Sequence, residues 1–483
     1  MNYTEKGSKL YLFSIVLVAV IGGLLFGYDT AVISGAEKGL QAFFMGADFE
    51  YTDAIHGITS SSALIGCIIG SAVSGFFASG LGRKNSLFLA GILFFLSALG
   101  SYYPEFLFFE HGVPSYSLLV AFNFYRVLGG IGVGLASAIC PMYIAEIAPS
   151  NIRGTLVSWN QFAIIFGQLV VYFVNFLILG SHANPVIDLV NGVNQIMNPE
   201  AAAWTTETGW RLMFVSEAVP AGLFALLVLL VPETPRYLAM CGKDERALNV
   251  LSRINGASQA KVILAEIKAT TEEKTERLFT YGWMVIFIGI MLSVFQQAVG
   301  INAVLYFAPR IFETMGMANP MVQTVLMGVV NILFTLLAVF TVEKWGRKPL
   351  LISGSVGMAI GAFGVAMCNV VTGLPAIISV ISIMVYSASF MFSWGPICWV
   401  LIAEIFPNTI RGAAVAIAVA FQWIFNFIVS STFLPMYNMR LGEMGDKFGH
   451  MFAYALYGII CVAAALFAVS YTHLRAHETS AHL

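Results

Sequence analysis

The chain has 483 residues, of which 58% are hydrophobic and 10% carry a charge. Soluble domains carry about 25% charged residues, so this composition excludes an ordinary soluble enzyme and indicates a protein that crosses a membrane many times. The net charge of −2 points to no nucleic-acid partner, and the six cysteines show no spacing typical of a metal site or a disulfide framework.

Apolar runs long enough to span a bilayer, about 20 residues each, recur along the whole chain. In the first half they cover residues 10–30, 58–79, 86–103, 117–141, 155–179 and 210–231. In the second half they cover residues 281–307, 321–342, 350–370, 375–402, 412–436 and 450–470. We therefore predict an all-α polytopic membrane protein with twelve transmembrane helices in two six-helix bundles. The first run is long enough to span, so we expect an uncleaved helix there rather than a signal peptide.

A polar stretch separates the two sets of spans. We expect an N-terminal six-helix bundle in residues 1–231, a cytoplasmic helical linker in 232–280, a C-terminal six-helix bundle in 281–470, and a non-native tail without function in 471–483. In the linker, Lys243–Ile254 and Gln259–Leu278 carry apolar residues at helical spacing with charges between them. Whether these short helices brace the two halves or only connect them stays open.

Basic residues gather at one end of the predicted spans. That end holds Lys6, Lys9, Arg83, Lys84, Arg153, Arg236, Lys344, Arg347, Lys348 and Arg411, together with the basic residues of the linker. The other end holds only Lys38, Arg310, Arg440 and Lys447. Because loops rich in lysine and arginine stay in the cytoplasm, we predict that the N-terminus, the linker and the end of the last span are cytoplasmic.

Two short strings occur twice. AEIAPSNIRG (Ala145–Gly154) returns as AEIFPNTIRG (Ala403–Gly412), at an offset of 403 − 145 = 258 residues, and GRK at Gly82 returns at Gly346, at an offset of 346 − 82 = 264. Two unrelated motifs repeated at nearly the same offset indicate a chain built from two related halves, an architecture typical of secondary transporters.

Three ionisable residues lie within predicted spans: Asp29 near the outer end of the first, Arg126 in the fourth and Glu217 in the sixth. A charge within a bilayer costs roughly 2.5–3.5 kcal/mol on insertion scales, so such residues suggest a function. They form either a static ion pair that fixes helix packing or a proton relay. In a relay, movement of Arg126 toward or away from Asp29 would release or load a proton, because burial disfavours a carboxylate and a nearby cation favours it.

Neutral amides and indoles also recur within the spans. Gln161, Gln168 and Asn175 stand seven residues apart, so they share one face of the fifth span. Later spans add Gln296, Gln297 and Asn302 beside Gly300, where the helix can break, and then Asn331, Trp399, Gln422 and Trp423. Each amide alone can be a hydrogen bond between helices. As a set, groups that both donate and accept, with indole faces, match an uncharged, polyhydroxylated ligand.

The repeated strings place acids and bases at cytoplasmic helix ends. The first copy supplies Glu146 and Arg153, the second supplies Glu404 and Arg411, and the GRK turns add Arg83 and Arg347. Anchoring by positive charge explains the basic residues but not the matched glutamates. We therefore expect an inner gate, in which salt bridges between helix ends form when the cytoplasmic side is closed and break when it opens.

Up to about residue 470, the chain resembles the sugar porter family of the major facilitator superfamily. The resemblance rests on both GRK turns and on GGLLFGYDTAVISG (Gly22–Gly35), YRVLGGIGVG (Tyr125–Gly134), PMYIAEIAPSNIRG (Pro141–Gly154), PETPR (Pro232–Arg236), FQQAVGINAVLYFAP (Phe295–Pro309) and SWGPICWVLIAEIFPNTIRG (Ser393–Gly412). It implies two bundles that rock about a central site.

The resemblance also implies roles for individual residues. Asp29 would couple transport to protons with Arg126 as its partner, and Glu217 would tune the pair. The implied sugar ligands are Gln161, Gln296, Gln297, Asn302, Trp399 and Gln422, and the implied cavity-lining residues are Phe26, Gln168, Tyr306, Asn331 and Trp423. Glu233 and Arg236 of PETPR would join the inner gate.

The expected function is proton-coupled symport of a neutral monosaccharide across a bacterial cytoplasmic (inner) membrane. The resemblance favours D-xylose, with D-glucose as the alternative substrate. A facilitative sugar uniporter and a transporter-like sugar receptor remain as alternative functions. No catalytic constellation and no phosphate-cradling loop with Lys and Ser/Thr is visible, so we expect neither an enzyme nor ATP drive, and no cofactor.

Overall fold

The computed structural model describes residues 7–106, 108–180, 203–271, 279–317, 319–371, 374–406 and 410–471. In these ranges the regular secondary structure is helical, apart from one isolated bridge between Leu441 and Gly445. Twelve helical stretches there are long and apolar enough to cross a membrane. The predicted fold class is confirmed, and the chain is a multi-pass membrane protein. The predicted tail lies outside the described residues, except for Tyr471.

The N-terminal half provides the first six of these stretches. Its elements are α1 (Lys9–Ala31), α2 (Ile33–Met45), α3 (Asp53–Ser60), α4 (Ser62–Gly80), α5 (Arg83–Tyr102), α6 (Tyr116–Ile147), α7 (Arg153–Gly180), the π-helical turn η1 (Thr205–Gly209), α9 (Trp210–Val215) and α10 (Ala218–Leu230). Three short helices follow in the linker: α11 (Pro235–Met240), α12 (Asp244–Asn255) and α13 (Ala257–Thr271).

The C-terminal half provides the other six. Its elements are α14 (Trp283–Ala298), α15 (Ile301–Tyr306), α16 (Ala308–Thr314), α17 (Pro320–Trp345), α18 (Arg347–Val370), α19 (Ala376–Phe392), α20 (Trp394–Ile405), α21 (Arg411–Tyr437), the 3₁₀ turn η2 (Gly442–Met444) and α22 (Asp446–Tyr471).

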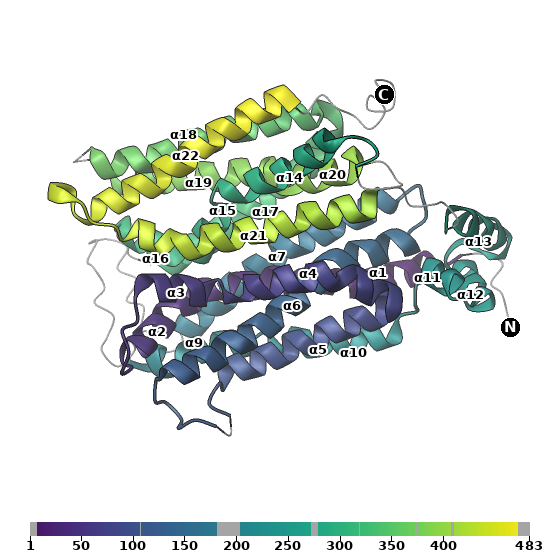
Figure 1. Cartoon of the computed structure of the whole chain (residues 1–483), viewed down its shortest axis with the longest axis horizontal. Helices are drawn as coiled ribbons and strands as arrows, with labels where there is room; N and C mark the ends of the chain where they lie inside the picture. Colours follow the sequence, from purple (N-terminus) through teal and green to yellow (C-terminus); the bar gives the residue numbers. More distant parts are fainter. Residues whose placement is uncertain are drawn as a thin grey trace.

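The two halves lie side by side with their helices running along the long axis of the molecule (Figure 1). Within the halves, α6 packs against α4 and α5, and α18 packs against α19 and α22. Between them, α3 and α4 pack against α21, and α7 packs against α17. The helices α11, α12 and α13 project from one end, here called the inner end, and α2, α3 and α16 lie at the opposite, outer end.

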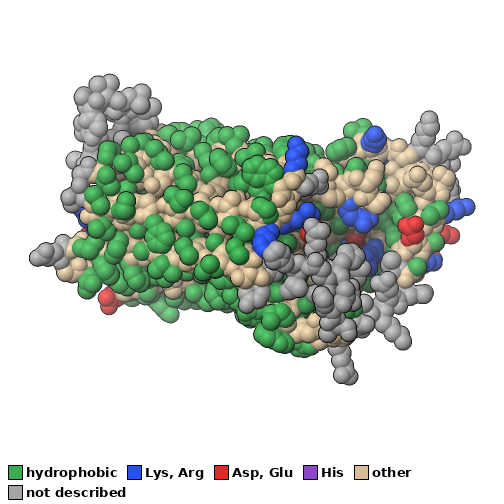
Figure 2. Space-filling view, turned by 90° about the horizontal axis from the view of Figure 1, so that it is seen from above, with side chains coloured by type: hydrophobic (Ala, Val, Ile, Leu, Met, Phe, Trp, Pro, Cys, Tyr) green, Lys and Arg blue, Asp and Glu red, His purple; other side chains and the backbone are tan. Residues whose placement is uncertain are grey.

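The flank of the molecule is apolar over most of its length. On the face seen in Figure 2, hydrophobic side chains cover most of the surface between the two ends, and lysines and arginines gather toward the inner end. Such a belt suits the hydrocarbon core of a bilayer, and the grouping of the basic side chains agrees with the sidedness predicted from the sequence.

The first span is longer than predicted, and this moves Asp29. The helix does not end near residue 30, because α1 and α2 follow one another to give a stretch of 37 residues, Lys9–Met45. Asp29 therefore lies near the middle of the span rather than near its outer end. The apolar run stops early because Glu37 and Lys38 interrupt it, yet the helix continues because Glu37 is fully buried against partners from other helices.

Two spans of the C-terminal half are broken. Gly300, with φ of 91°, separates α14 from α15, and Ser393 separates α19 from α20. A residue with a side chain adopts such a positive φ only with strain, and a Cβ on Gly300 would also come within 2.6 Å of the Tyr457 ring. The break expected at Gly300 is thus present, and it turns the amides on either side of it toward the space between the halves.

The linker helices pack on the N-terminal half. The helix α12 buries Ala247, Val250, Leu251 and Ile254. The Ser8 amide donates to the Arg253 carbonyl at 2.9 Å, and the Arg253 guanidinium lies 3.8 Å from the Tyr11 ring centroid. These contacts attach the linker to α1, while a brace between the halves stays a prediction.

Candidate functional site

A cavity of about 80 Å³ lies between the two halves. The N-terminal half contributes residues of α1 and α7, and the C-terminal half contributes residues of α14, α15, α19, α20 and α21. The lining residues are Phe26, Thr30, Gln161, Ile164, Ile165, Gln168, Gln296, Gln297, Asn302, Leu305, Tyr306, Phe390, Met391, Gly395, Trp399, Gln422, Trp423 and Asn426. None of these side chains is charged, so the cavity offers a neutral ligand its polar contacts without a counter-ion.

Every predicted ligand or lining residue except Asn331 borders this cavity. Asn331 is buried on α17, where its side-chain oxygen accepts a hydrogen bond from Ser387 Oγ at 2.7 Å. It therefore ties α17 to α19 and does not line the cavity. Binding of a sugar by the other residues stays a prediction.

The cavity amides hydrogen-bond to one another. Gln296 donates to the backbone carbonyls of Trp394 and Gly395 at 3.1 and 3.2 Å, and its own side-chain oxygen accepts from Gln422. Across the break at Gly300, Asn302 donates to Gln297 at 2.6 Å. A bound ligand would exchange some of these amide–amide bonds for its own hydroxyls.

Three buried polar atoms at the cavity have no hydrogen-bond partner. They are Gln168 Oε1, Gln422 Oε1 and Trp423 Nε1. Buried polar groups are normally satisfied, so two acceptors and one donor without partners, on three residues that line one cavity, indicate a site for a ligand that both donates and accepts.

Two aromatic side chains from opposite halves meet at the cavity. The rings of Phe26 on α1 and Trp423 on α21 lie 5.5 Å apart between centroids. Tyr306 accepts a hydrogen bond from Asn426 at 3.5 Å. The structure also adds Thr30, Asn426, Phe390 and Met391, which the sequence analysis had not assigned to the cavity. Asn426 had a signal, because it stands one helical turn after Gln422 and so shares its face.

The predicted charge cluster forms within the N-terminal half. Arg126 Nη1 lies 2.7 Å from Asp29 Oδ1, and Arg126 Nη2 donates to the Asp29 backbone carbonyl at 3.1 Å. Asp29 is fully buried and Arg126 is 2% exposed. The pair lies beside the cavity, since Thr30, the next residue of α1, lines it.

Glu217 is fully buried as well, and its carboxyl group interacts with that of Asp29, while no other side chain or backbone amide donates to its oxygens. It is close to Asp29 in the fold, because Tyr28 and Ser216, the residues preceding the two acids, hydrogen-bond to each other at 2.7 Å. The cluster therefore has two carboxyl groups for one guanidinium. An arrangement with one carboxyl group in excess suits a site that takes up and releases a proton.

Two ion pairs form among the predicted inner-gate residues, each within one half. Arg83 Nη2 lies 2.8 Å from Glu146 Oε1, and Arg347 Nη2 lies 2.9 Å from Glu404 Oε1. The first pair is nearly buried, whereas the second is partly exposed. The first also extends into the PETPR string, because Thr234 Oγ1 donates to Glu146 at 2.6 Å.

Glu233 closes the turn before α5. It accepts hydrogen bonds from the backbone amides of Arg83 and Lys84 at 3.2 and 3.1 Å. Burial nevertheless raises the pKa of Glu233 above its ordinary value, because these hydrogen bonds and the Arg83 charge only partly offset the loss of hydration. Arg153 and Arg236 are exposed, and the Arg411 side chain lies outside the described residues. The gating role of this set stays a prediction.

The sequence analysis missed a buried ion pair between Arg211 and Glu105. At the outer end, Arg211 contacts both carboxyl oxygens of Glu105, at 2.8 and 2.5 Å. Burial alone would raise the pKa of Glu105, but the Arg211 hydrogen bonds and charge outweigh it and hold the pKa below its ordinary value. The described residues include no group of His, Cys, Asp and Glu side chains that could hold a metal ion.

Comparisons with known proteins agree on one family. The family model described as "Sugar (and other) transporter" matches residues 15–481. The D-xylose-proton symporter of Escherichia coli is 47% identical over 95% of this chain and 92% of its own length. The glucose facilitated diffusion protein of Zymomonas mobilis is 34% identical over 96% and 94% of the two chains. Among solved structures, the inward open conformation of the Escherichia coli xylose transporter XylE matches with a TM-score of 0.82 and 44% identity, covering 97% of this chain and 99% of the other.

Proposed function

Because the chain belongs to the sugar transporter family, we propose that it is a symporter that carries D-xylose together with protons across the membrane. The observation that carries this proposal is the proximity of a neutral, amide-lined cavity to a fully buried Asp29–Arg126 pair. The relative named a D-xylose-proton symporter supports both the substrate and the coupling ion. The protein would move its substrate unchanged and catalyse no covalent reaction.

The sugar binds between the two halves. Hydroxyl groups of a pentose meet the unpartnered oxygens of Gln168 and Gln422 and the indole N–H of Trp423, and they replace the bonds that Gln296 and Gln297 make to other cavity amides. Phe26 and Trp423 contribute aromatic faces on which the C–H groups of the ring can pack. Since Phe26 and Trp423 belong to different halves, the sugar contacts both.

Proton coupling uses the charge cluster next to the cavity. Protonation of Asp29 removes the charge that holds Arg126, so the two side chains can separate and α1 can shift relative to α6. The helix α1 places Phe26 and Thr30 at the cavity and Asp29 in the ion pair. Both sugar binding and protonation therefore act on the position of the same helix. Glu217 supplies a second buried carboxyl group in the same cluster. It can pair with the Arg126 guanidinium or accept the proton.

The principal alternative is facilitated diffusion, the function in the name of the Zymomonas mobilis relative. A uniporter needs no titratable group beside its sugar site, so the buried Asp29–Arg126 pair favours symport. We place the protein in the cytoplasmic (inner) membrane of a bacterium. The concentration of basic side chains toward the end with α11, α12 and α13 supports a cytoplasmic position for that end and for the N-terminus.

Uptake of labelled D-xylose into proteoliposomes tests the proposal. With an imposed inward proton gradient, we expect accumulation above the external concentration, and a protonophore should collapse it. Without the gradient, uptake should only equilibrate. Saturable uptake that equilibrates under both conditions would contradict symport and support the uniporter.

A further inference from the structure

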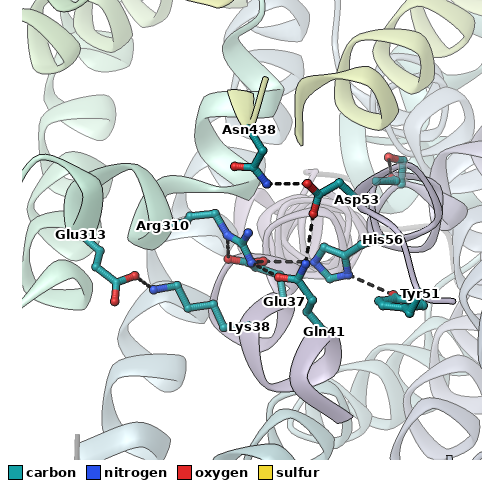
Figure 3. Close-up of polar contacts among 11 residues, drawn as sticks. Glu37, Lys38, Gln41, Tyr51, Asp53, His56, Arg310, Glu313 and Asn438 are labelled. Atoms are coloured by element: carbon teal, nitrogen blue, oxygen red, sulfur yellow. Dashed lines mark hydrogen bonds and ion pairs between the residues drawn. The ribbon is translucent and has the colours of Figure 1, made fainter. Parts of the chain in front are cut away.

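A polar cluster at the outer end joins the two halves, and neither the repeated motifs nor the sugar site involves it (Figure 3). Its centre is Glu37 on α2, which is fully buried. Arg310 on α16 of the other half donates Nε to Glu37 Oε1 at 3.0 Å and Nη2 to Glu37 Oε2 at 2.7 Å. A bidentate ion pair of this kind fixes both the distance and the relative orientation of the guanidinium and the carboxylate.

His56 on α3 is the second partner of the Glu37 carboxylate. Its Nε2 lies 3.2 Å from Glu37 Oε2, and its Nδ1 lies 3.0 Å from the Tyr51 hydroxyl. The imidazole is fully buried. Held on both sides, the ring keeps the carboxylate turned toward Arg310, so His56 is a positioning residue for the pair.

Two further contacts cross between the halves beside this pair. Lys38 on α2 pairs with Glu313 on α16. Asn438, which follows α21, donates to Asp53 Oδ2 at 2.8 Å. Gln41 connects the second contact with the centre, because it accepts from Arg310 and donates to Asp53 at 3.4 Å. The same contacts that close the outer end must therefore break if the halves separate there.

We propose that Glu37, Arg310 and His56 form an outer latch that holds the transporter closed to the outside and must open before substrate enters. This inference rests on the proposed transport function, in which the two halves rock about the central site. In the closed state Arg310 neutralises a carboxylate that has no access to water. When the halves part at the outer end, water can hydrate Glu37 and Arg310 separately, so opening exchanges the pair for hydration.

A latch and a purely structural ion pair differ in how their loss affects the populations of the closed and open states. Loss of a merely structural ion pair lowers stability without favouring either side of the cycle. Loss of the Arg310 contact leaves the Glu37 charge uncompensated in the closed state only, so it shifts the population toward the outward-open state.

Spin-label distance measurements across the outer end test this directly and require no transport. Labels are attached at Met45→Cys on α2 and Val322→Cys on α17, positions that are 64% and 42% exposed in opposite halves. Cys241 and Cys368 are replaced by serine so that they do not take up label, since Cys241 is exposed and Cys368 is partly exposed. The other four native cysteines are buried and can stay. We expect Arg310→Gln to raise the ratio of long to short distances by about tenfold, a coupling of typical size, and His56→Leu to raise it less.

Arg440→Gln is the matched control. Arg440 is also an arginine of the outer end, but it pairs with Asp446 of its own half at 2.5 Å, so its removal should leave the distances unchanged. If Arg310→Gln does not fold, Arg310→Lys keeps the charge, loses the bidentate contact and should give a smaller shift in the same direction. Folded Arg310 variants with the distance distribution of the parent would overturn the latch, whether or not the protein transports D-xylose.

Discussion

Single polar atoms determine what the central cavity can bind. An unsatisfied buried donor or acceptor costs about 1–3 kcal/mol, and the cavity contains such atoms on Gln168, Gln422 and Trp423. A sugar hydroxyl satisfies either kind, because it donates one hydrogen bond and accepts others. An ionic ligand would instead leave its charge unpaired, since none of the lining residues is charged.

Gln296 is the most connected of the cavity amides. It links the Gln422 amide to the carbonyls of Trp394 and Gly395, so Gln296→Ala should weaken D-xylose binding about tenfold, as loss of one to two hydrogen bonds implies. Isothermal titration of the purified protein measures the change. Asn331→Ala is the control, since it removes an amide outside the cavity. Equal affinities for Gln296→Ala and the parent would place the sugar elsewhere.

At the residue scale, the sequence predicted most of the cavity but not its edges. The amides stood out because polar side chains are rare in apolar spans, and the family resemblance assigned them. Asn331 looked the same in sequence, yet it faces Ser387 of α19. Only the rotation of α17 against α19 determines which of these two environments it meets. Thr30 was overlooked because a threonine in a helix gives no signal of its own.

At the scale of elements, the breaks in the C-terminal half shape the site. Gln296 and Gln297 precede Gly300, and Asn302 follows it, so the interruption brings three amides of one span to the same cavity. An unbroken helix would turn Asn302 away, because residues five apart lie on different faces. Broken helices at the centre of a span are a recurrent feature of transporter sites.

Gly300→Ala tests the importance of the break. The substitution strains a residue with φ of 91° and places a Cβ 2.6 Å from the Tyr457 ring, so we expect a lower melting temperature in detergent together with weaker D-xylose binding. Gly316→Ala separates the effect of backbone strain from that of the steric clash. Gly316 also has a positive φ, of 82°, but the space around its Cβ position is open. It should lose some stability and keep its affinity. If both variants bind D-xylose as the parent does, the break has no part in the site.

Local patterns predicted the spans well because each must present a long apolar surface to lipid. Local patterns gave the wrong end for a span where a charged residue is buried and paired with a residue far away in the sequence. The first span continues through Glu37, whose partner Arg310 is 273 positions away. In the sequence analysis, Lys38 and Arg310 served only to identify the end of the spans that holds few basic residues. The charge pairing that allows α2 to remain helical is a tertiary contact, which no local window contains.

At the scale of the whole molecule, the two ends differ. Ion pairs and hydrogen bonds join the halves at the outer end, whereas the Arg83–Glu146 and Arg347–Glu404 pairs at the inner end each lie within one half. Of these ion pairs and hydrogen bonds, the ones that join the halves therefore lie at the outer end. The breaking of the inner pairs on opening stays a prediction.

Asp29→Asn separates proton coupling from sugar transport in a single substitution. The asparagine is nearly isosteric and can still accept a hydrogen bond from Arg126, but it cannot be protonated to release it. In one proteoliposome preparation, labelled D-xylose is followed under an inward proton gradient and in exchange with internal unlabelled D-xylose. We expect exchange to continue while accumulation above equilibrium is lost. Accumulation equal to that of the parent protein would contradict proton coupling by Asp29 and leave Asp29–Arg126 as a structural ion pair.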